Sequence, residues 1–89
     1  MRLEWDESKH LRNIEKHGFD FLRAGEVLSE KHILVPSRTH GAEQRHKAIG
    51  MIQGRFAAVI FTMRGAYYRI ISIRSARRGE RRQYQEVHG

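Results

Sequence analysis

The chain has 89 residues, 39% of them apolar, and a net charge of +7 at pH 7. A chain of this length forms one domain, over residues 1–89, that buries only about 60–65% of its unfolded surface. It has no apolar run near the ~20 residues of a membrane span, no signal-peptide segment and no cysteine. These features exclude disulfides and thiolate chemistry, and we expect a cytoplasmic protein without a membrane partner.

The positive charge is concentrated in the C-terminal part of the chain. Residues 64–89 contain seven basic and two acidic residues, whereas residues 1–33 contain six basic and seven acidic ones. Thirteen of the 17 basic residues are arginine, whose guanidinium group suits forked contacts with phosphate oxygens. The charge therefore predicts a nucleic acid or an acidic protein as partner.

The N-terminal third is predicted to form a strand followed by two helices. Residues 2–5, RLEW, alternate in the way of a short strand. Asp6 is a suitable N-cap for a helix over residues 7–17. Asp20 can cap a second helix, in which Phe21, Ala24, Val27 and Leu28 follow helical spacing.

Four strands and a helix are predicted to follow. HILVP reads as a strand that Pro36 ends, and SRTHGAEQ as a loop. The next three strands, HKAIGMI, FAAVIFTM and YYRIISIR, are separated by Gln53-Gly54-Arg55 and Arg64-Gly65-Ala66, whose glycines suit tight hairpins. ARRGERRQYQEV is a polar helix that Gly79 weakens by up to about 1 kcal/mol. The order β-α-α-β-β-β-β-α predicts an α+β fold with a small antiparallel sheet.

The hairpins allow cross-strand neighbours to be predicted by counting. If each turn has two central residues, Thr62 lies between Arg45 and Arg69 in one row. Because next-but-one strands lie about 9–10 Å apart, the two arginines would flank a gap that suits a phosphodiester. Three further residues share this face at the same end: Lys47, Arg64 and Tyr67. The alternative is that Arg45 and Arg69 pair with nearby carboxylates, because a one-residue slip would reverse the face. The candidate carboxylates are Glu43, Glu80 and Glu86.

By the same count, Ile71 and Ile73 share the face of Thr62, and Arg74 lies on the opposite face. Arg74 would then face two small residues, Ala57 and Gly50. Glu80 and Tyr84 are four residues apart on the last helix and point the same way. In one interpretation Arg74 binds phosphate and Tyr84 stacks on a base or donates its hydroxyl. In the other, Arg74 pairs with Glu80 and Tyr84 is a core residue.

Two segments, WDESKHLRNIEKHGFDFLRA and RIISIRSARRGERRQY, resemble the BrnT family of toxins from type II toxin–antitoxin modules. The resemblance implies a RelE-like fold and RNA cleavage that inhibits translation and growth. It also implies a BrnA-type antitoxin as partner, in a toxin–antitoxin heterotetramer that reaches DNA only through the antitoxin. The chain departs from the family pattern in the loop GAEQR and at Gly79.

A ribonuclease without metal must orient the 2′-hydroxyl of RNA, move two protons and stabilise a phosphorane. The predicted catalytic residues are His17, Arg64, Arg69, Arg74 and Tyr84. The predicted RNA-binding residues are Lys16, Arg45, Lys47, Arg77, Arg78 and Arg81. No metal site or cofactor is expected, because the six histidines lack metal-ligand spacing. Two alternatives stay open: His17 as a helix-end cation, and a non-catalytic basic module that binds nucleic acid or an acidic protein.

Overall fold

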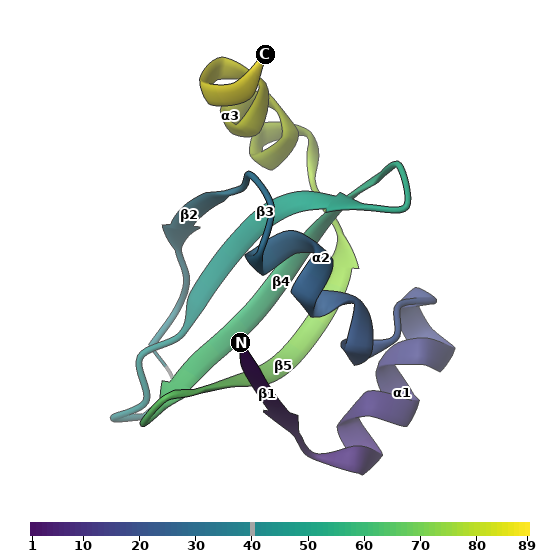
Figure 1. The fold of residues 1–89 in the computed structure, drawn as a ribbon, viewed down its shortest axis with the longest axis vertical. Coiled ribbons are helices and arrows are strands. Elements are labelled where there is room, and N and C mark those ends of the chain that lie inside the picture. The colour runs from purple at the N-terminus through teal and green to yellow at the C-terminus, as the bar shows by residue number, and fades with distance from the viewer. Residues whose placement is uncertain (40) are drawn as a thin grey trace.

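The computed structural model describes residues 1–39 and 41–89 as an α+β domain, as predicted (Figure 1). Its elements are β1 (Arg2–Trp5), α1 (Glu7–His17), a 3₁₀ turn (Phe21–Arg23), α2 (Ala24–Leu28), β2 (Ile33–Pro36), β3 (His46–Ile52), β4 (Arg55–Arg64), β5 (Tyr67–Ser75) and α3 (Arg78–His88). The five strands form one sheet in the order β1-β5-β4-β3-β2. No helix in the described part is long and apolar enough to span a membrane.

The helical N-terminal region forms as its capping residues predict. The Asp6 carboxylate accepts hydrogen bonds from the backbone N–H groups of Ser8 and Lys9 and starts α1. Gly18, with φ of 74°, ends α1 in the left-handed conformation that glycine adopts readily. Asp20 caps the next turn through Leu22 N–H, but the predicted second helix is divided into the 3₁₀ turn and the short α2.

The predicted antiparallel meander is confirmed for β2 to β5, and β1 adds a parallel strand beside β5. The sheet is therefore mixed. Both hairpins have the expected two-residue turns, with positive φ at Gln53 and Gly54 in the first and at Gly65 in the second. Thr62 pairs with Arg69, as counted from the second turn.

A β-bulge in β5 changes the face of the residues that follow it. Phe61 pairs with Ile70, but its neighbour Ile60 pairs with Ser72, which leaves Ile71 as the extra residue. The predictions for Ile73 and Arg74 were therefore wrong. Ile73 is buried in the core between the sheet and its N-terminal helices, and Arg74 lies opposite Ala58 on the other face, not opposite Ala57.

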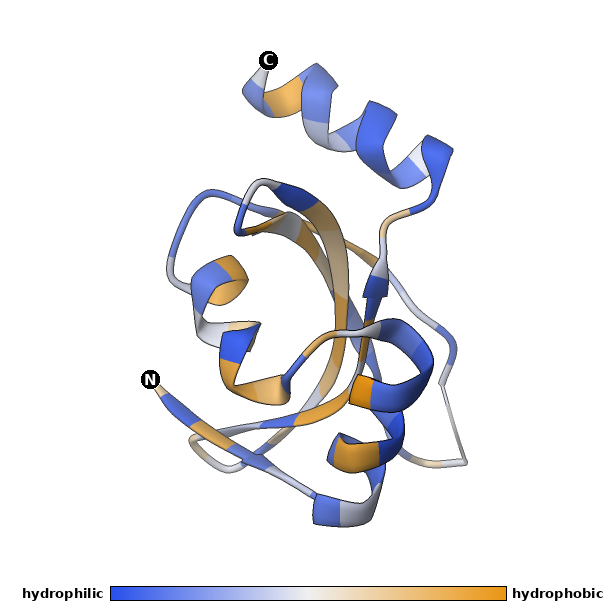
Figure 2. Ribbon diagram, turned by 90° about the vertical axis from the view of Figure 1, so that its right-hand side faces the viewer, coloured by the Kyte–Doolittle hydropathy of each residue, from blue (hydrophilic) through white to orange (hydrophobic). Residues whose placement is uncertain are grey.

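Two apolar clusters hold the sheet between its helices. The larger cluster lies between the sheet and the segment from α1 to α2, and Phe21, Val27 and Ile70 are fully or almost fully buried in it. Gly50 lets α2 approach β3, because a Cβ there would lie 2.9 Å from Val27 Cγ1. A smaller cluster around Ile49, Ala58 and Tyr84 lies under α3 on the opposite face. Figure 2 shows that α3 is mostly hydrophilic and covers only one end of the molecule.

Candidate functional site

A basic cleft opens on the same sheet face as α3, beside the start of that helix. It has a volume of about 560 Å³ and is lined by Pro36, Ser37, Arg38, Arg45, Lys47, Ile60, Ile71, Ser72, Arg74 and Arg77. Half of these residues are basic and none is acidic. Lys47 comes from β3, Arg74 from β5, Arg77 from the start of α3, and Arg38 and Arg45 from the segment between β2 and β3. The fold thus brings cations from distant parts of the chain to one hollow.

Glu80 of α3 connects the start of that helix to strands β3 and β5 beside the cleft. Its carboxylate accepts two hydrogen bonds from the Arg74 guanidinium, both 2.9 Å, and one of 2.8 Å from Arg77 N–H. Lys47 Nζ lies 2.7 Å from Oε2, and Glu80 is only 8% exposed. Burial opposes ionisation and raises the pKa, but the bonds from Arg74, Arg77 N–H and Lys47 outweigh it and lower the pKa of Glu80 to about 2. The carboxylate is therefore ionised across the physiological range.

The cleft keeps an excess of positive charge after its ion pairs are counted. Lys47 and Arg74 share the single charge of Glu80, and Arg45 Nε lies 3.1 Å from Glu43 Oε2. Arg38 and Arg77 make no ion pair within the described residues. These two guanidinium groups are the ones that an external anion would meet without displacing a carboxylate.

Four of the predicted site residues line this cleft: Arg45, Lys47, Arg74 and Arg77. Arg45 and Arg69 do not flank a gap over Thr62: the hollow of about 360 Å³ that Thr62 lines contains Arg64 but neither of these two arginines. Thr62 is 5% exposed and donates a 2.7 Å hydrogen bond to Gln44 O. Arg69 NH1 lies 2.7 Å from Glu4 Oε2, because β1 runs beside β5 and brings Glu4 opposite it. The cleft is displaced along the strands, toward Ile60 and Ser72.

The other predicted residues lie outside the cleft. Lys16 and His17 form the end of α1, and Arg64 ends β4 beside a hairpin turn. Tyr84 is 6% exposed and packs edge-on against Phe56, with ring centroids 5.4 Å apart. The core interpretation of Tyr84 and the Arg74–Glu80 ion pair are thus confirmed. Two more residues, Arg78 and Arg81, line a separate hollow on α3. The catalytic role of His17 stays a prediction without support from its position.

Sequence reasoning missed Arg38 and the correct face of Arg74. Arg38 follows β2 in a segment without any periodic pattern, so no local signal marks it. The face of Arg74 did have a signal. Ile70 and Ile73 are both almost fully buried in the same cluster, and an interval of three residues between two such positions requires a bulge in a strand that alternates.

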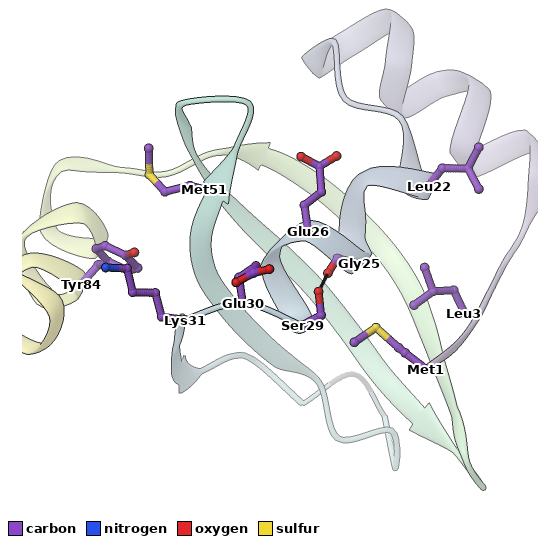
Figure 3. Close-up of a pocket in the computed structure, with 10 residues that line it drawn as sticks. All are labelled: Met1, Leu3, Leu22, Gly25, Glu26, Ser29, Glu30, Lys31, Met51 and Tyr84. Carbon is purple, nitrogen blue, oxygen red and sulfur yellow. Dashed lines mark hydrogen bonds between the residues drawn. The ribbon is translucent and has the colours of Figure 1, made fainter.

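A larger hollow than the basic cleft, of about 710 Å³, lies between β1, α2 and α3. Figure 3 shows Tyr84 at one end of it, Met1 and Leu3 at the other, and α2 between them. Its charged lining residues are Glu26, Glu30 and Lys31, and no arginine lines it. This chemistry does not suit a phosphate, so size alone does not identify the candidate site. Within residues 1–39 and 41–89, no three histidine, aspartate or glutamate side chains are placed to hold a metal ion.

Comparisons with known proteins agree with the sequence resemblance. Residues 5–80 match the family described as the ribonuclease toxin BrnT of type II toxin–antitoxin systems. The crystal structure of the Brucella abortus ribonuclease toxin BrnT is similar, with a TM-score of 0.70 and 38% sequence identity. The match covers 88% of this chain and 99% of the Brucella chain. No curated protein sequence matches the chain significantly. With most of its length matched in both sequence and structure, the chain belongs to the BrnT family of ribonuclease toxins of type II toxin–antitoxin systems.

Proposed function

We propose that the basic cleft binds RNA and cleaves it without metal, by attack of a 2′-hydroxyl on the adjacent phosphate. The observation that carries this proposal is the convergence of five basic side chains on one hollow of about 560 Å³. A cleft of this size and charge accommodates a nucleotide linkage. RNA supplies its own nucleophile, so the protein must position the linkage and stabilise the phosphorane.

The arrangement suggests a role for each cation. Arg38 and Arg77, which have no ion pair in the described part of the chain, stabilise the charge that develops on the phosphorane oxygens. Lys47 supplies the proton for the leaving 5′-oxygen, because arginine does not release a proton in proteins. The proton of the attacking 2′-hydroxyl passes to solvent water, from which Lys47 takes up a proton again after the cleavage. Glu80 is not the base: its pKa is held at about 2 and its oxygens accept bonds from Arg74, Arg77 N–H and Lys47. It holds Arg74 and Lys47 in place.

The same charge accounts for the expected inhibition. An antitoxin of the BrnA type would neutralise the toxin by covering the basic cleft with acidic or apolar groups. We propose a toxin–antitoxin heterotetramer in the cytoplasm, in which DNA is contacted only through the antitoxin and free toxin stops growth by cleaving RNA.

The test is to incubate the purified protein with an RNA oligonucleotide in EDTA and to analyse the new ends. We expect products with 2′,3′-cyclic phosphate. The double variant Arg38→Gln/Arg77→Gln should lose at least 100-fold in kcat/KM, since two charge-stabilising contacts are removed. Because neither arginine has a carboxylate partner in the described part, this variant leaves no buried charge uncompensated. Arg2→Gln/Arg12→Gln gives the same net charge and serves as the control.

The alternative, a non-catalytic basic module, predicts a different outcome in the same experiment. RNA would bind in a salt-dependent way and remain intact. Intact RNA at high protein concentration, with binding demonstrated, would contradict the proposed cleavage.

A further inference from the structure

The outer side of α3 carries a second basic surface, separate from the basic cleft. Phe56 of β4 lines a hollow of about 280 Å³ together with Arg78, Arg81, Arg82 and Gln85 of α3. We refer to these five residues as the arginine patch. The four α3 residues are exposed and Phe56 is half-buried. None of the five lines the basic cleft.

The charges of the arginine patch are unmatched. Within the residues that the structure describes, none of its three arginines forms an ion pair. By contrast, Arg74 pairs with Glu80 and Arg69 with Glu4. Arg81 and Arg82 follow Arg78 by three and four residues on α3. Like charges at these spacings lie side by side on a helix and repel each other. An external anion would relieve this repulsion.

The aromatic ring of Phe56 indicates which class of anionic partner fits the arginine patch. Phe56 is fixed from one side by Tyr84, with the two ring planes 78° apart. An aromatic ring surrounded by arginines is the combination that binds single-stranded nucleic acid, because bases stack on the ring while cations contact the backbone. An acidic peptide or a free phosphate would use the arginines but not the ring.

The two basic surfaces meet at the start of α3. Arg77 lines the basic cleft and Arg78 lines the arginine patch, and the Cα atoms of consecutive residues are only about 3.8 Å apart. An RNA strand with one phosphodiester linkage in the basic cleft therefore reaches the arginine patch by passing the first turn of α3.

We propose that the arginine patch is a second RNA-binding subsite, which holds the strand next to the linkage in the basic cleft. This inference rests on the proposed function of the cleft. It makes recognition dependent on length: an RNA that reaches both surfaces binds more tightly than one that fills the cleft alone.

The experiment uses the triple variant Arg78→Gln/Arg81→Gln/Arg82→Gln of the full chain. Glutamine keeps a helix propensity close to that of arginine, and circular dichroism verifies the fold. Arg2→Gln/Arg12→Gln/Arg23→Gln is the control with the same net charge. Binding is measured with a 2′-O-methyl RNA 20-mer, which lacks the nucleophile, and cleavage with an RNA 20-mer and a dinucleotide.

The patch variant should bind the 20-mer at least tenfold more weakly than the control. Its log–log salt dependence should be shallower by about 2, since single strands contribute about 0.7 per phosphate contact. The KM for the 20-mer should rise while kcat/KM for the dinucleotide stays within twofold. The variant with lysine at the same three positions should keep the salt dependence.

Equal 20-mer binding by the patch variant and the control would overturn the proposal. So would a patch variant that loses affinity for poly-glutamate but not for RNA, which would indicate an acidic protein partner. The test also separates this proposal from the proposed function of the basic cleft. If the cleft does not cleave RNA, the wild type will cut neither the 20-mer nor the dinucleotide. Binding of the 2′-O-methyl 20-mer will still show whether the arginine patch binds RNA.

Discussion

The two ends of the chain fasten a helix to the sheet in different ways. At the N-terminal end, α1 is held by Asn13, which is 6% exposed and bonds to both the N–H and the C=O of Ile73 on β5. β1 pairs with β5 only as far as Ile70, so the Asn13 amide takes the place of a strand there. His10 adds a second contact, between the carboxylates of Glu7 and Asp20. All the groups that hold α1 find partners within the fold.

At the C-terminal end, α3 is held by Glu80, by the packing of Tyr84 on Phe56 and by a bond between His88 Nε2 and His32 O. The donors that meet Glu80 belong to Lys47 and Arg74, which also line the basic cleft. The contacts of α1 are therefore closed within the fold, whereas those of α3 share Lys47 and Arg74 with the basic cleft.

The largest effect is expected for Glu80→Ala. The substitution leaves Lys47 and Arg74 facing each other without a counter-ion and detaches α3, at a cost of about 2–4 kcal/mol in the free energy of unfolding. Denaturant unfolding measures the cost, and limited trypsin digestion shows whether α3 is released first.

The stability of the wild type and of Glu80→Ala at acid pH provides a second check on the role of Glu80. The pKa of Glu80 is lowered from 4.5 to about 2, so its contribution is complete above pH 4.5 and is lost as the pH falls toward 2. The difference in stability between the wild type and Glu80→Ala should shrink over that interval. A constant difference would show that the carboxylate charge does not hold α3.

A smaller loss, of about 2 kcal/mol, is expected for Asn13→Ala. The alanine leaves the N–H and C=O of Ile73 and the carbonyl of Phe19 without the Asn13 amide. Hydrogen exchange should show faster exchange at Ile73 than in the wild type, while the centre of β4 stays protected. Unchanged exchange at Ile73 would contradict the role assigned to Asn13.

The smallest effect, of about 1 kcal/mol, is expected for His10→Gln and depends on pH. Burial lowers the pKa of His10, but the bonds to Glu7 and Asp20 outweigh it and raise the pKa above 6.5. The imidazolium therefore stabilises the fold fully below pH 6.5, and this contribution is lost as the pH rises through the raised pKa. Thermal unfolding should show the two proteins converging at high pH.

The parts of the fold that depend on neighbouring residues could be predicted from the sequence. Asp6, Gly18 and the two hairpin glycines act locally through capping and positive φ, and each element they delimit is present. The parallel docking of β1 could not be predicted, because no local pattern places Glu4 beside Arg69.

The candidate site was predicted only in part for the same physical reason. Lys47 and Arg45 follow from the first hairpin, whose register is regular. Arg74 reaches the cleft because the bulge at Ile71 reverses its face, and a count that assumes regular pairing puts it on the wrong side. Arg38 depends on the path of the segment after β2, which only tertiary structure determines.

The most direct test of the account compares Arg77→Gln with Arg69→Gln in metal-free RNA cleavage. Arg77 lines the basic cleft without a carboxylate partner on its side chain in the described residues, whereas Arg69 lies outside the cleft and pairs with Glu4. We predict that Arg77→Gln loses at least tenfold more kcat/KM than Arg69→Gln. The reverse order would place the reaction near Thr62, outside the basic cleft, and would contradict the account.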